Sequence, residues 1–305
     1  MNILPGGLYP VMITPFNNNG AIDYKGLEEL VEFYIEKGSK GLFANCLSSE
    51  MYYLSDEERI ELTKKVVEFA KGRVPVLSSG TFNHEIEKVS EFFKKIYSTG
   101  VNAVIINSNQ LNKPTDDEIT FKNSIESLLN QTDNIPVGIY ECPVPYKRLI
   151  SADLLGWMAG TERFLYFKDT SCDNNNIADK LKATKGSKLG LFNANIPTGL
   201  QSLKDGGAGL SPIGANYFPE LYAFVCDNYK DESKSVEIRK VNTFLSVIDL
   251  LIHSCYPFAS KFFLQKRGLK IGLKTRTDYV PFTAQDYIKF DDLMVAFEDI
   301  KPLIA

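Results

Sequence analysis

Short apolar runs alternate with longer amphipathic segments through the first two thirds of the chain. Several of the runs are rich in Val, Ile and Phe, which is typical of parallel strands buried on both faces. The eight runs are residues 8–14, 41–44, 74–79, 101–107, 136–140, 164–168, 189–193 and 209–212. The pattern therefore predicts eight buried parallel strands.

The segments between the runs carry helix-start signals. Ser55 and Thr115 are each followed three residues later by a glutamate, Glu58 and Glu118, which is the spacing of a capping box. Weaker signals of the same kind are Asn83, before residues 84–97, and Thr198, before residues 199–204. The predicted order is a strand–helix unit repeated eight times.

Eight such units within about 215 residues predict an α/β fold, a closed (β/α)8 TIM barrel. An open doubly wound sheet is the alternative, but no Gly-x-Gly-x-x-Gly turn follows the first run. After residue 212 the pattern is helical, so we expect a barrel over residues 1–216 and a C-terminal helical extension over 217–305. The extension cannot bury both of its faces alone, and we expect it to pack on the barrel as part of one structural unit, on a neighbouring subunit, or on both.

The composition favours a globular protein that binds a small molecule. The chain has 305 residues, 44% of them hydrophobic, and a net charge of −4, without a long run of like charge that would indicate a nucleic-acid or membrane surface. No apolar segment approaches the roughly 18 residues of a membrane span, and residues 1–10 lack the features of a secretory signal. We expect a cytoplasmic protein with no nucleic-acid or membrane partner.

Few residues are available for metal or imidazole chemistry. His84 and His253 are the only histidines, which argues against most zinc sites and against a Ser/His/Asp triad. The five cysteines are irregularly spaced and fit a reducing compartment better than a disulfide framework. Cys46, Cys142 and Cys172 fall near strand ends, and we interpret them as small buried side chains rather than a thiolate cluster. We expect no metal site.

The polar residues that end the runs are the candidates for chemistry, because the active site of a (β/α)8 barrel lies at the carboxyl ends of its strands. One amine and one phenol are among them, but no carboxylate. These residues are Thr14, Asn45, Ser79, Asn107, Tyr140, Lys168, Asn193 and Ser211.

Lys168 is the candidate nucleophile. The chain has 34 Lys and Arg residues, most of which must be solvated, but Lys168 closes the apolar run 164–167 and precedes the polar turn 169–171. Burial there lowers the pKa of an amine, and a neutral amine attacks carbonyl carbon. Tyr140 ends the preceding run, and if both side chains point inward they meet at the barrel mouth. A phenol can supply the acid and base that imine formation requires.

A set of short motifs lies between residues 7 and 170 of the chain. It comprises Gly7, Thr14-Pro15-Phe16, Ser48-Ser49-Glu50, Leu54-Ser55-x-x-Glu58-Arg59, Tyr140-x-x-Pro143 and Lys168-Asp169-Thr170. By these motifs the chain resembles the pyruvate-dependent class I aldolase family that includes dihydrodipicolinate synthase and N-acetylneuraminate lyase. The resemblance implies a TIM barrel with a C-terminal helical extension, a homo-oligomer (a tetramer or a dimer), and no cofactor.

The resemblance also implies roles for individual residues. Lys168 would form a Schiff base with pyruvate or another 2-oxo acid, and Tyr140 would shuttle protons. The loop of residues 46–50 would hold the substrate carboxylate through the Ser48 hydroxyl and the amides of Ser48 and Ser49. The further candidate substrate-binding residues are Thr170, Asn193, Ser211 and Asn107.

Several positions depart from the family pattern. Leu47 and Leu111 stand where the synthase relays protons through a threonine and a second tyrosine, and Pro145 stands where it holds the second substrate with an arginine. The lyase has a carboxylate pair after its seventh strand, where this chain has Asn193 and Asn195. Amides and hydroxyls at the predicted mouth suit the hydroxyls of a sugar-derived chain better than the charges of an amino acid.

The leading hypothesis is a class I aldolase, a lyase that uses the Lys168 imine to make or break the C3–C4 bond of 2-oxo-3-deoxy sugar acids. A dehydratase that expels the C4 hydroxyl through the same imine is one alternative. A binding or regulatory module for 2-oxo acids, suggested by Leu47 and Leu111, is the other. We expect Glu50 to be structural, and the sequence assigns no role to Glu141.

Overall fold

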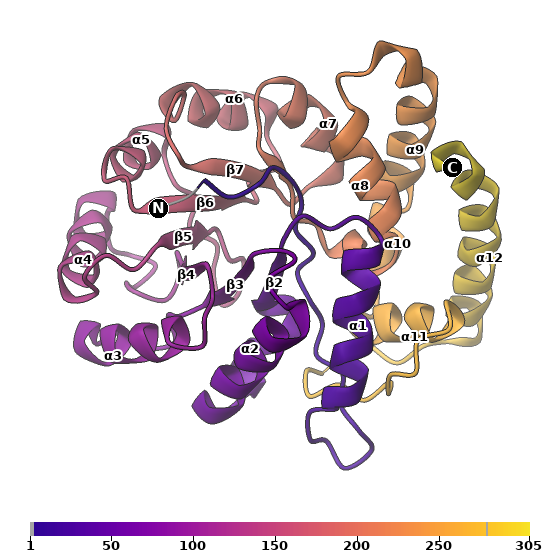
Figure 1. The fold of residues 1–305 in the computed structure, drawn as a ribbon, viewed down its shortest axis with the longest axis horizontal. Helices are drawn as coiled ribbons and strands as arrows, with labels where there is room; N and C mark the ends of the chain where they lie inside the picture. Colours follow the sequence, from indigo (N-terminus) through magenta and orange to yellow (C-terminus); the bar gives the residue numbers. More distant parts are fainter. Residues whose placement is uncertain (1–2, 279) are drawn as a thin grey trace.

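The computed structural model describes residues 3–278 and 280–305, within which eight parallel strands form one sheet (Figure 1). The strands are β1 (Gly7–Leu8), β2 (Leu42–Asn45), β3 (Val76–Ser79), β4 (Ala103–Asn107), β5 (Val137–Tyr140), β6 (Phe164–Asp169), β7 (Gly190–Asn193) and β8 (Gly209–Leu210). β1 pairs with β8, and a bridge between Val11 and Phe43 joins the segment after β1 to β2, which closes the barrel. The predicted TIM barrel is confirmed. The first run is mostly not strand, because residues 8–14 hold only the end of β1 and this bridge.

Helices surround the sheet on its outer side (Figure 1). The ring consists of α1 (Tyr24–Glu36), α2 (Asp56–Ala70), α3 (Ile86–Tyr97), α4 (Glu118–Gln131), α5 (Ala152–Gly160), α6 (Asn174–Ala183), α7 (Ile196–Lys204) and α8 (Pro219–Asn228). The helical tail continues with α9 (Ser235–Val247), α10 (Asp249–His253), α11 (Phe258–Lys266) and α12 (Ala284–Ile300). α8 packs on β1 and β8, so one helix of the ring comes after residue 216. The predicted division into a barrel of residues 1–216 and an extension of residues 217–305 stays a prediction.

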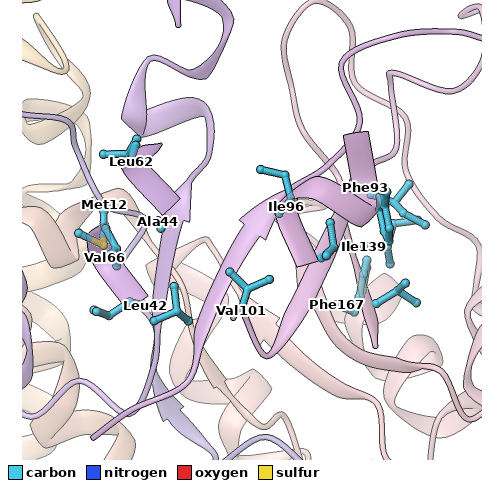
Figure 2. Close-up of a cluster of buried hydrophobic side chains, with 14 of the residues drawn as sticks. Met12, Leu42, Ala44, Leu62, Val66, Phe93, Ile96, Val101, Ile139 and Phe167 are labelled. Atoms are coloured by element: carbon cyan, nitrogen blue, oxygen red, sulfur yellow. The ribbon is translucent and has the colours of Figure 1, made fainter. Parts of the chain in front are cut away.

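Side chains along the strands alternate between two apolar layers. Tyr140 and Tyr166 belong to the cluster inside the barrel. Ile139 and Phe167, their neighbours in sequence, belong to the layer between the sheet and the helices, where Figure 2 shows them. Because successive residues of a strand face opposite sides, Lys168 shares the inward direction of Tyr166.

Of the two predicted capping boxes, one is confirmed and the other is wrong. Ser55 caps α2 as predicted: its hydroxyl accepts from the Glu58 amide, and the Glu58 carboxylate accepts from the Ser55 amide. Thr115 is wrong as the cap of α4, which begins directly after Asp117. The Asp117 carboxylate accepts from the Thr120 amide at 2.8 Å, so a second short polar side chain takes the capping position.

The two weaker helix starts are also wrong. Asn83 accepts from the amides of His84 and Glu85 in a turn that precedes α3. Asn195 caps α7 by accepting from the amide of Thr198, which lies inside the helix. Short polar side chains bind the backbone of a turn as readily as a helix start, so their position alone did not determine the boundary.

The tail packs on the barrel through an aromatic core. The ring of Phe218, just before α8, lies 5.0 Å from that of Phe263 on α11 and 5.1 Å from that of Phe297 on α12, measured between ring centroids. Leu8 of β1 and Leu210 of β8 belong to the same cluster. Barrel and tail therefore share one apolar core.

A buried ion pair also joins the tail to the barrel. The Lys261 ammonium, on α11, donates to Oε1 of Glu50 at 2.9 Å and to the carbonyl oxygen of Lys274 at 2.6 Å. Oε2 of Glu50 accepts from the amides of Arg276 and Thr277 at 2.5 and 2.7 Å. These contacts give Glu50 a structural role, in agreement with the expectation from the sequence.

We expect Lys261→Met to lower the free energy of unfolding by about 3–5 kcal/mol, because the Glu50 carboxylate then stays buried without its ammonium partner. Denaturant unfolding followed by circular dichroism measures the change. Lys188→Met is the control, since Lys188 forms a 3.2 Å pair with Glu162 at the surface, where such pairs contribute about 0–1 kcal/mol. Equal losses in the two variants would contradict this account of the ion pair.

Candidate active site

A cavity of about 720 Å³ opens at the carboxyl ends of the strands. Lys168 and Tyr140 line it together with Ser48 and Thr170. The tail helix α10 adds a further wall on the outer side. Small-molecule sites have volumes of about 300–1,000 Å³, so this cavity accommodates a ligand considerably longer than a three-carbon acid.

Lys168 lies next to last in β6 and is in register with Tyr140 of β5. Only 3% of its surface is exposed. This burial disfavours the ammonium and lowers the pKa of Lys168 to about 8. At pH 7 roughly one molecule in ten then carries a neutral amine, compared with about one in a few thousand for an ordinary lysine.

Tyr140 ends β5 beside the amine. Nζ of Lys168 lies 4.5 Å from the centroid of the Tyr140 ring, and the ring of Phe43 packs edge-on at 5.9 Å between centroids. Burial raises the pKa of the Tyr140 phenol well above its ordinary value, so the hydroxyl keeps its proton. The structure thus brings the two predicted catalytic residues together, facing one cavity.

Ser49 does not present its hydroxyl to the cavity. Its Oγ lies 2.7 Å from the carbonyl oxygen of Met12 and 2.6 Å from that of Ala44, and it accepts from the Cys46 amide at 3.1 Å. The Ser49 amide donates to the Cys46 carbonyl. Ser49 therefore fixes the shape of the loop after β2, and we no longer assign it a contact with substrate.

Ser48 is the member of this loop that lines the cavity. The Tyr256 phenol lines the cavity as well. The Asn216 amide donates to the Tyr256 oxygen at 3.1 Å, so the phenol hydrogen remains for Ser48 or for a ligand. Ser48 and Tyr256 together can offer two hydroxyl donors to a carboxylate.

Asn107, Asn193 and Ser211 are fully buried and lie outside the lining of the cavity. The Asn193 amide donates to Oγ1 of Thr198 at 2.9 Å, and the Ser211 hydroxyl donates to the carbonyl of Tyr9 at 2.7 Å. The Asn107 carboxamide is likewise used within the protein. These three residues fasten the ends of strands β4, β7 and β8, and we no longer assign them contacts with substrate.

Thr170 lines the cavity, but Glu141 holds it in place. The Thr170 amide donates to Oε2 of Glu141 at 2.8 Å, and the Thr170 hydroxyl donates to the backbone oxygen of Glu141 at 2.8 Å. With its hydrogen used in this way, the Thr170 oxygen can only accept from a ligand. Thr170 is therefore suited to a substrate hydroxyl rather than to a carboxylate.

Glu141 belongs to a buried ion network on the outer side of strands β5 and β6. The Lys180 ammonium, from α6, donates to Oε1 of Glu141 at 2.7 Å and to Oδ2 of Asp169 at 2.6 Å, and all three side chains are fully buried. Glu141 follows Tyr140, and Asp169 follows Lys168. Lys180 thus joins the two strand ends and holds their register, which is the role that the sequence left open for Glu141.

Several cavity residues were not predicted as site residues. They are Tyr52 of the short helix η2 (Met51–Tyr53), Lys147 in the loop after β5, and Asp249 and His253 of α10. Nδ1 of His253 lies 2.6 Å from the carbonyl oxygen of Asp249, so Nδ1 carries the hydrogen and Nε2 is free to accept. The sequence singled out His253 only as one of two histidines, and no spacing in it predicted that α10 lies over the barrel mouth.

The described part of the chain contains no metal-binding cluster, membrane-spanning helix or disulfide. Within residues 3–278 and 280–305, no group of three or more metal-ligating side chains lies close enough to hold an ion. Over the same residues, no helix is long and apolar enough to cross a membrane. The five cysteines are free thiols, of which only Cys172 is exposed.

Comparisons with known proteins relate the whole chain to one family. A model described as the dihydrodipicolinate synthetase family matches residues 4–296. The chain is 25% identical over 263 residues to 4-hydroxy-tetrahydrodipicolinate synthase of Shewanella piezotolerans, covering 86% of this chain and 88% of that protein. It is 26% identical over 264 residues to the protein of the same name from Clostridium novyi, covering 86% of each.

Solved structures with a similar fold carry related names. Dihydrodipicolinate synthase from Bacillus anthracis matches with a TM-score of 0.87 over 96% of this chain and 99% of that chain, at 21% identity. The chloride-inhibited dihydrodipicolinate synthase from Acinetobacter baumannii, complexed with pyruvate, matches with a TM-score of 0.84 over 98% and 99%, at 21% identity. At these identities the likeness establishes the fold, a barrel with a helical tail.

We expect Lys168→Met to raise the free energy of unfolding at pH 7. Lowering the pKa of the lysine from 10.5 to about 8 corresponds to about 3 kcal/mol. Below pH 8 the buried amine is charged and this cost is complete, whereas it declines between pH 8 and 10.5 and is absent above. The advantage of Lys168→Met in denaturant unfolding should therefore shrink by about 3 kcal/mol over that range.

Lys95→Met is the control for this pH series, because Lys95 is exposed on α3. We expect its effect on stability to be independent of pH between 7 and 10. A stability difference for Lys168→Met that is equally independent of pH would contradict a buried amine with a lowered pKa.

Proposed function

The chain belongs to the dihydrodipicolinate synthetase family and is a lyase, and from this premise we propose that it is a class I aldolase acting on 2-oxo-3-deoxy sugar acids and pyruvate. One observation carries the proposal: the Lys168 amine, with a pKa of about 8, lies in register with Tyr140 and faces a cavity of about 720 Å³. An amine of this kind is the group that forms imines with 2-oxo acids at neutral pH.

The reaction proceeds through an imine of Lys168. The neutral amine adds to the C2 carbonyl carbon, and Tyr140 protonates the resulting hydroxyl, which leaves as water while the C=N bond forms. The protonated imine then accepts the C3–C4 electron pair, and loss of the C4 hydroxyl proton releases an aldehyde. Protonation of the remaining enamine at C3, followed by hydrolysis, returns Lys168 and liberates pyruvate. Tyr140, whose ring centroid lies 4.5 Å from Nζ of Lys168, supplies the acid and the base in these steps.

Ser48 and Tyr256 bind the substrate carboxylate in this proposal. Both line the cavity, and together they can present two hydroxyl hydrogens. Hydrogen bonds to a charged acceptor are about twice as strong as those between neutral groups, so two such donors orient the 2-oxo acid with C2 toward Lys168. Thr170, whose hydroxyl already donates to Glu141, accepts from a hydroxyl farther along the chain.

The outer half of the cavity favours a hydroxylated chain over a second carboxylate. The Asp249 carboxylate and Nε2 of His253 are acceptors, and Asn195 offers a further polar group. Lys147 is the cation of this wall, but its ammonium already donates to the carbonyl oxygen of Thr170. Lys147 keeps its charge, but the Asp249 carboxylate in the same wall and Pro145 in the loop make this part of the cavity better suited to hydroxyl groups than to the carboxylate of an amino acid. This supports a sugar-derived substrate.

We place the protein in the cytoplasm as a homo-oligomer, a tetramer or a dimer, without cofactor or metal. The helical tail supports the oligomer, because several of its apolar side chains are more than half exposed. They are Val236, Val247, Leu250, Ile288 and Val295, on α9, α10 and α12. In the predicted division, residues 1–216 contain the barrel strands, and residues 217–305 carry these exposed apolar side chains.

Borohydride reduction in the presence of pyruvate tests the imine. We expect the wild-type protein to gain the mass of one reduced pyruvyl group, and Lys168→Ala to gain none, because the amine is lost. Below pH 8 the trapping rate should fall about tenfold per pH unit, as the ammonium replaces the amine. Lys188→Ala, at the surface, is the matched control and should be labelled like wild type. An adduct that persists on Lys168→Ala would overturn the proposal.

Substitutions in the outer wall of the cavity test the proposed substrate class. We expect Asp249→Asn and His253→Gln each to raise the KM for a cleaved 2-oxo-3-deoxy sugar acid about tenfold, since one hydrogen bond to a hydroxyl contributes about 1 kcal/mol or more. Pyruvate trapping should not change. His84→Gln, the other histidine and an exposed one, is the control. Product analysis over a panel of such acids identifies pyruvate plus aldehyde as cleavage, and a dehydrated 2-oxo acid as the dehydratase alternative.

A further inference from the structure

The Tyr256 phenol can bind a carboxylate only if its hydrogen points into the cavity. Its ring packs against both the layer between the sheet and the helices and the core of the tail, which fixes the position of the oxygen. The hydrogen itself still rotates about the C–O bond and can lie on either side of that oxygen. A group that donates to one side of the oxygen therefore decides on which side the hydrogen lies.

Asn216 is the group that donates to the Tyr256 oxygen. Its Nδ2 lies 3.1 Å from that oxygen. Asn216 ends the short helix η3 (Ile213–Asn216), is fully buried and lies outside the lining of the cavity. The amide thus reaches the oxygen from the interior of the protein, and the phenol hydrogen is left on the side of the cavity.

Three further contacts fix the orientation of the Asn216 amide. Nδ2 also donates to the carbonyl oxygens of Val11 at 2.9 Å and Ile213 at 3.0 Å, so its two hydrogens serve three oxygens and one hydrogen is shared. Oδ1 accepts from the hydroxyl of Tyr34. Half a turn of the amide would place Oδ1 against two carbonyl oxygens, so only the observed orientation, with Nδ2 toward Tyr256, satisfies all of these groups.

We propose that Asn216 and Tyr34 are positioning residues for the substrate carboxylate and act through Tyr256. The inference rests on the proposed function, in which Tyr256 binds the carboxylate of the 2-oxo acid, and adds two residues to it. Asn216 directs the Tyr256 hydrogen into the cavity, and Tyr34 holds the Asn216 amide. Neither residue touches the substrate, because both lie outside the cavity lining.

This chain of hydrogen bonds joins three parts of the fold. Tyr34 lies on α1, Asn216 follows β8, and Tyr256 lies in the tail between α10 and α11. Val11, the third contact of the amide, forms the bridge that closes the barrel. The donor that the tail offers to the cavity is therefore oriented by the barrel. Hydrogen bonds in such a chain polarise one another, which makes the phenol a stronger donor.

The pyruvate dependence of borohydride trapping tests these roles. The pyruvate concentration that gives half the maximal trapping rate reports binding, whereas the rate at saturating pyruvate reports the Lys168 amine. We expect Tyr256→Phe to raise the half-saturating concentration tenfold or more, because a hydrogen bond to a charged group is lost. Asn216→Leu should raise it about tenfold and Tyr34→Phe about threefold, with the rate at saturation within twofold of wild type.

The same substitutions in a Tyr256→Phe background separate positioning from a structural role. Because Asn216 and Tyr34 act through the phenol, neither change should raise the half-saturating concentration further in that background. Thr132→Val is the control for a lost buried hydrogen bond. Thr132 directly follows α4, and its hydroxyl donates to the carbonyl oxygen of Leu128 at 2.7 Å, outside the cavity lining. This variant should unfold at a lower temperature and keep the wild-type half-saturating concentration.

The outcomes distinguish failure of the imine function from failure of these roles. Absence of the pyruvyl adduct on the wild-type protein would overturn both. With normal trapping, an unchanged half-saturating concentration in Tyr256→Phe or Asn216→Leu would overturn the roles alone, as would a rise in Asn216→Leu that persists in the Tyr256→Phe background. If Asn216→Leu does not fold, Tyr34→Phe decides by the same criteria, since it keeps the amide and its two carbonyl contacts.

Discussion

The Lys168 ammonium is held out of water at the end of β6, and its burial disfavours the charged form of the amine. Desolvation is the largest influence on its pKa, and the nearby thiols of Cys46 and Cys142 act in the opposite direction when they ionise. A neutral nucleophile is thus obtained by burial rather than by a neighbouring cation. Folding must supply the free energy, and the aromatic interior of the barrel contributes to it, since Tyr166 stacks on Phe192 with ring centroids 4.6 Å apart.

The same two strands carry opposite chemistry on their two sides. Lys168 and Tyr140 face inward and line the cavity, whereas the next residues, Asp169 and Glu141, face outward and share the Lys180 ammonium. A buried ion network tolerates little displacement, because each carboxylate loses a partner if the strands slip. The outer network therefore keeps Lys168 and Tyr140 in register, and the alternation that turns these two residues inward also turns their supporting carboxylates outward.

The sequence predicted the features that follow from periodicity and failed for those that depend on where loops lie. Alternation along β5 and β6 was sufficient to bring Tyr140 and Lys168 together. It was not sufficient for Asn193 or Ser211, because a polar residue at a strand end can face either the cavity or the backbone of the adjoining turn. His253 illustrates the second difficulty: it reaches the cavity from a tail helix, and no local pattern records a contact over that separation in sequence.

The tail is part of the active site as well as of the fold. It supplies Asp249, His253 and Tyr256 to the cavity, and its Lys261 holds Glu50, which stands two residues after Ser48 in the loop that follows β2. A change in the tail therefore acts on the loop of residues 46–50 and on the outer wall of the cavity. Lys168 and Tyr140 do not depend on the tail in this way, since Lys180 of α6 holds the register of their strands. The outer part of the cavity can then vary through the tail while the arrangement of Lys168 and Tyr140 in the barrel is kept.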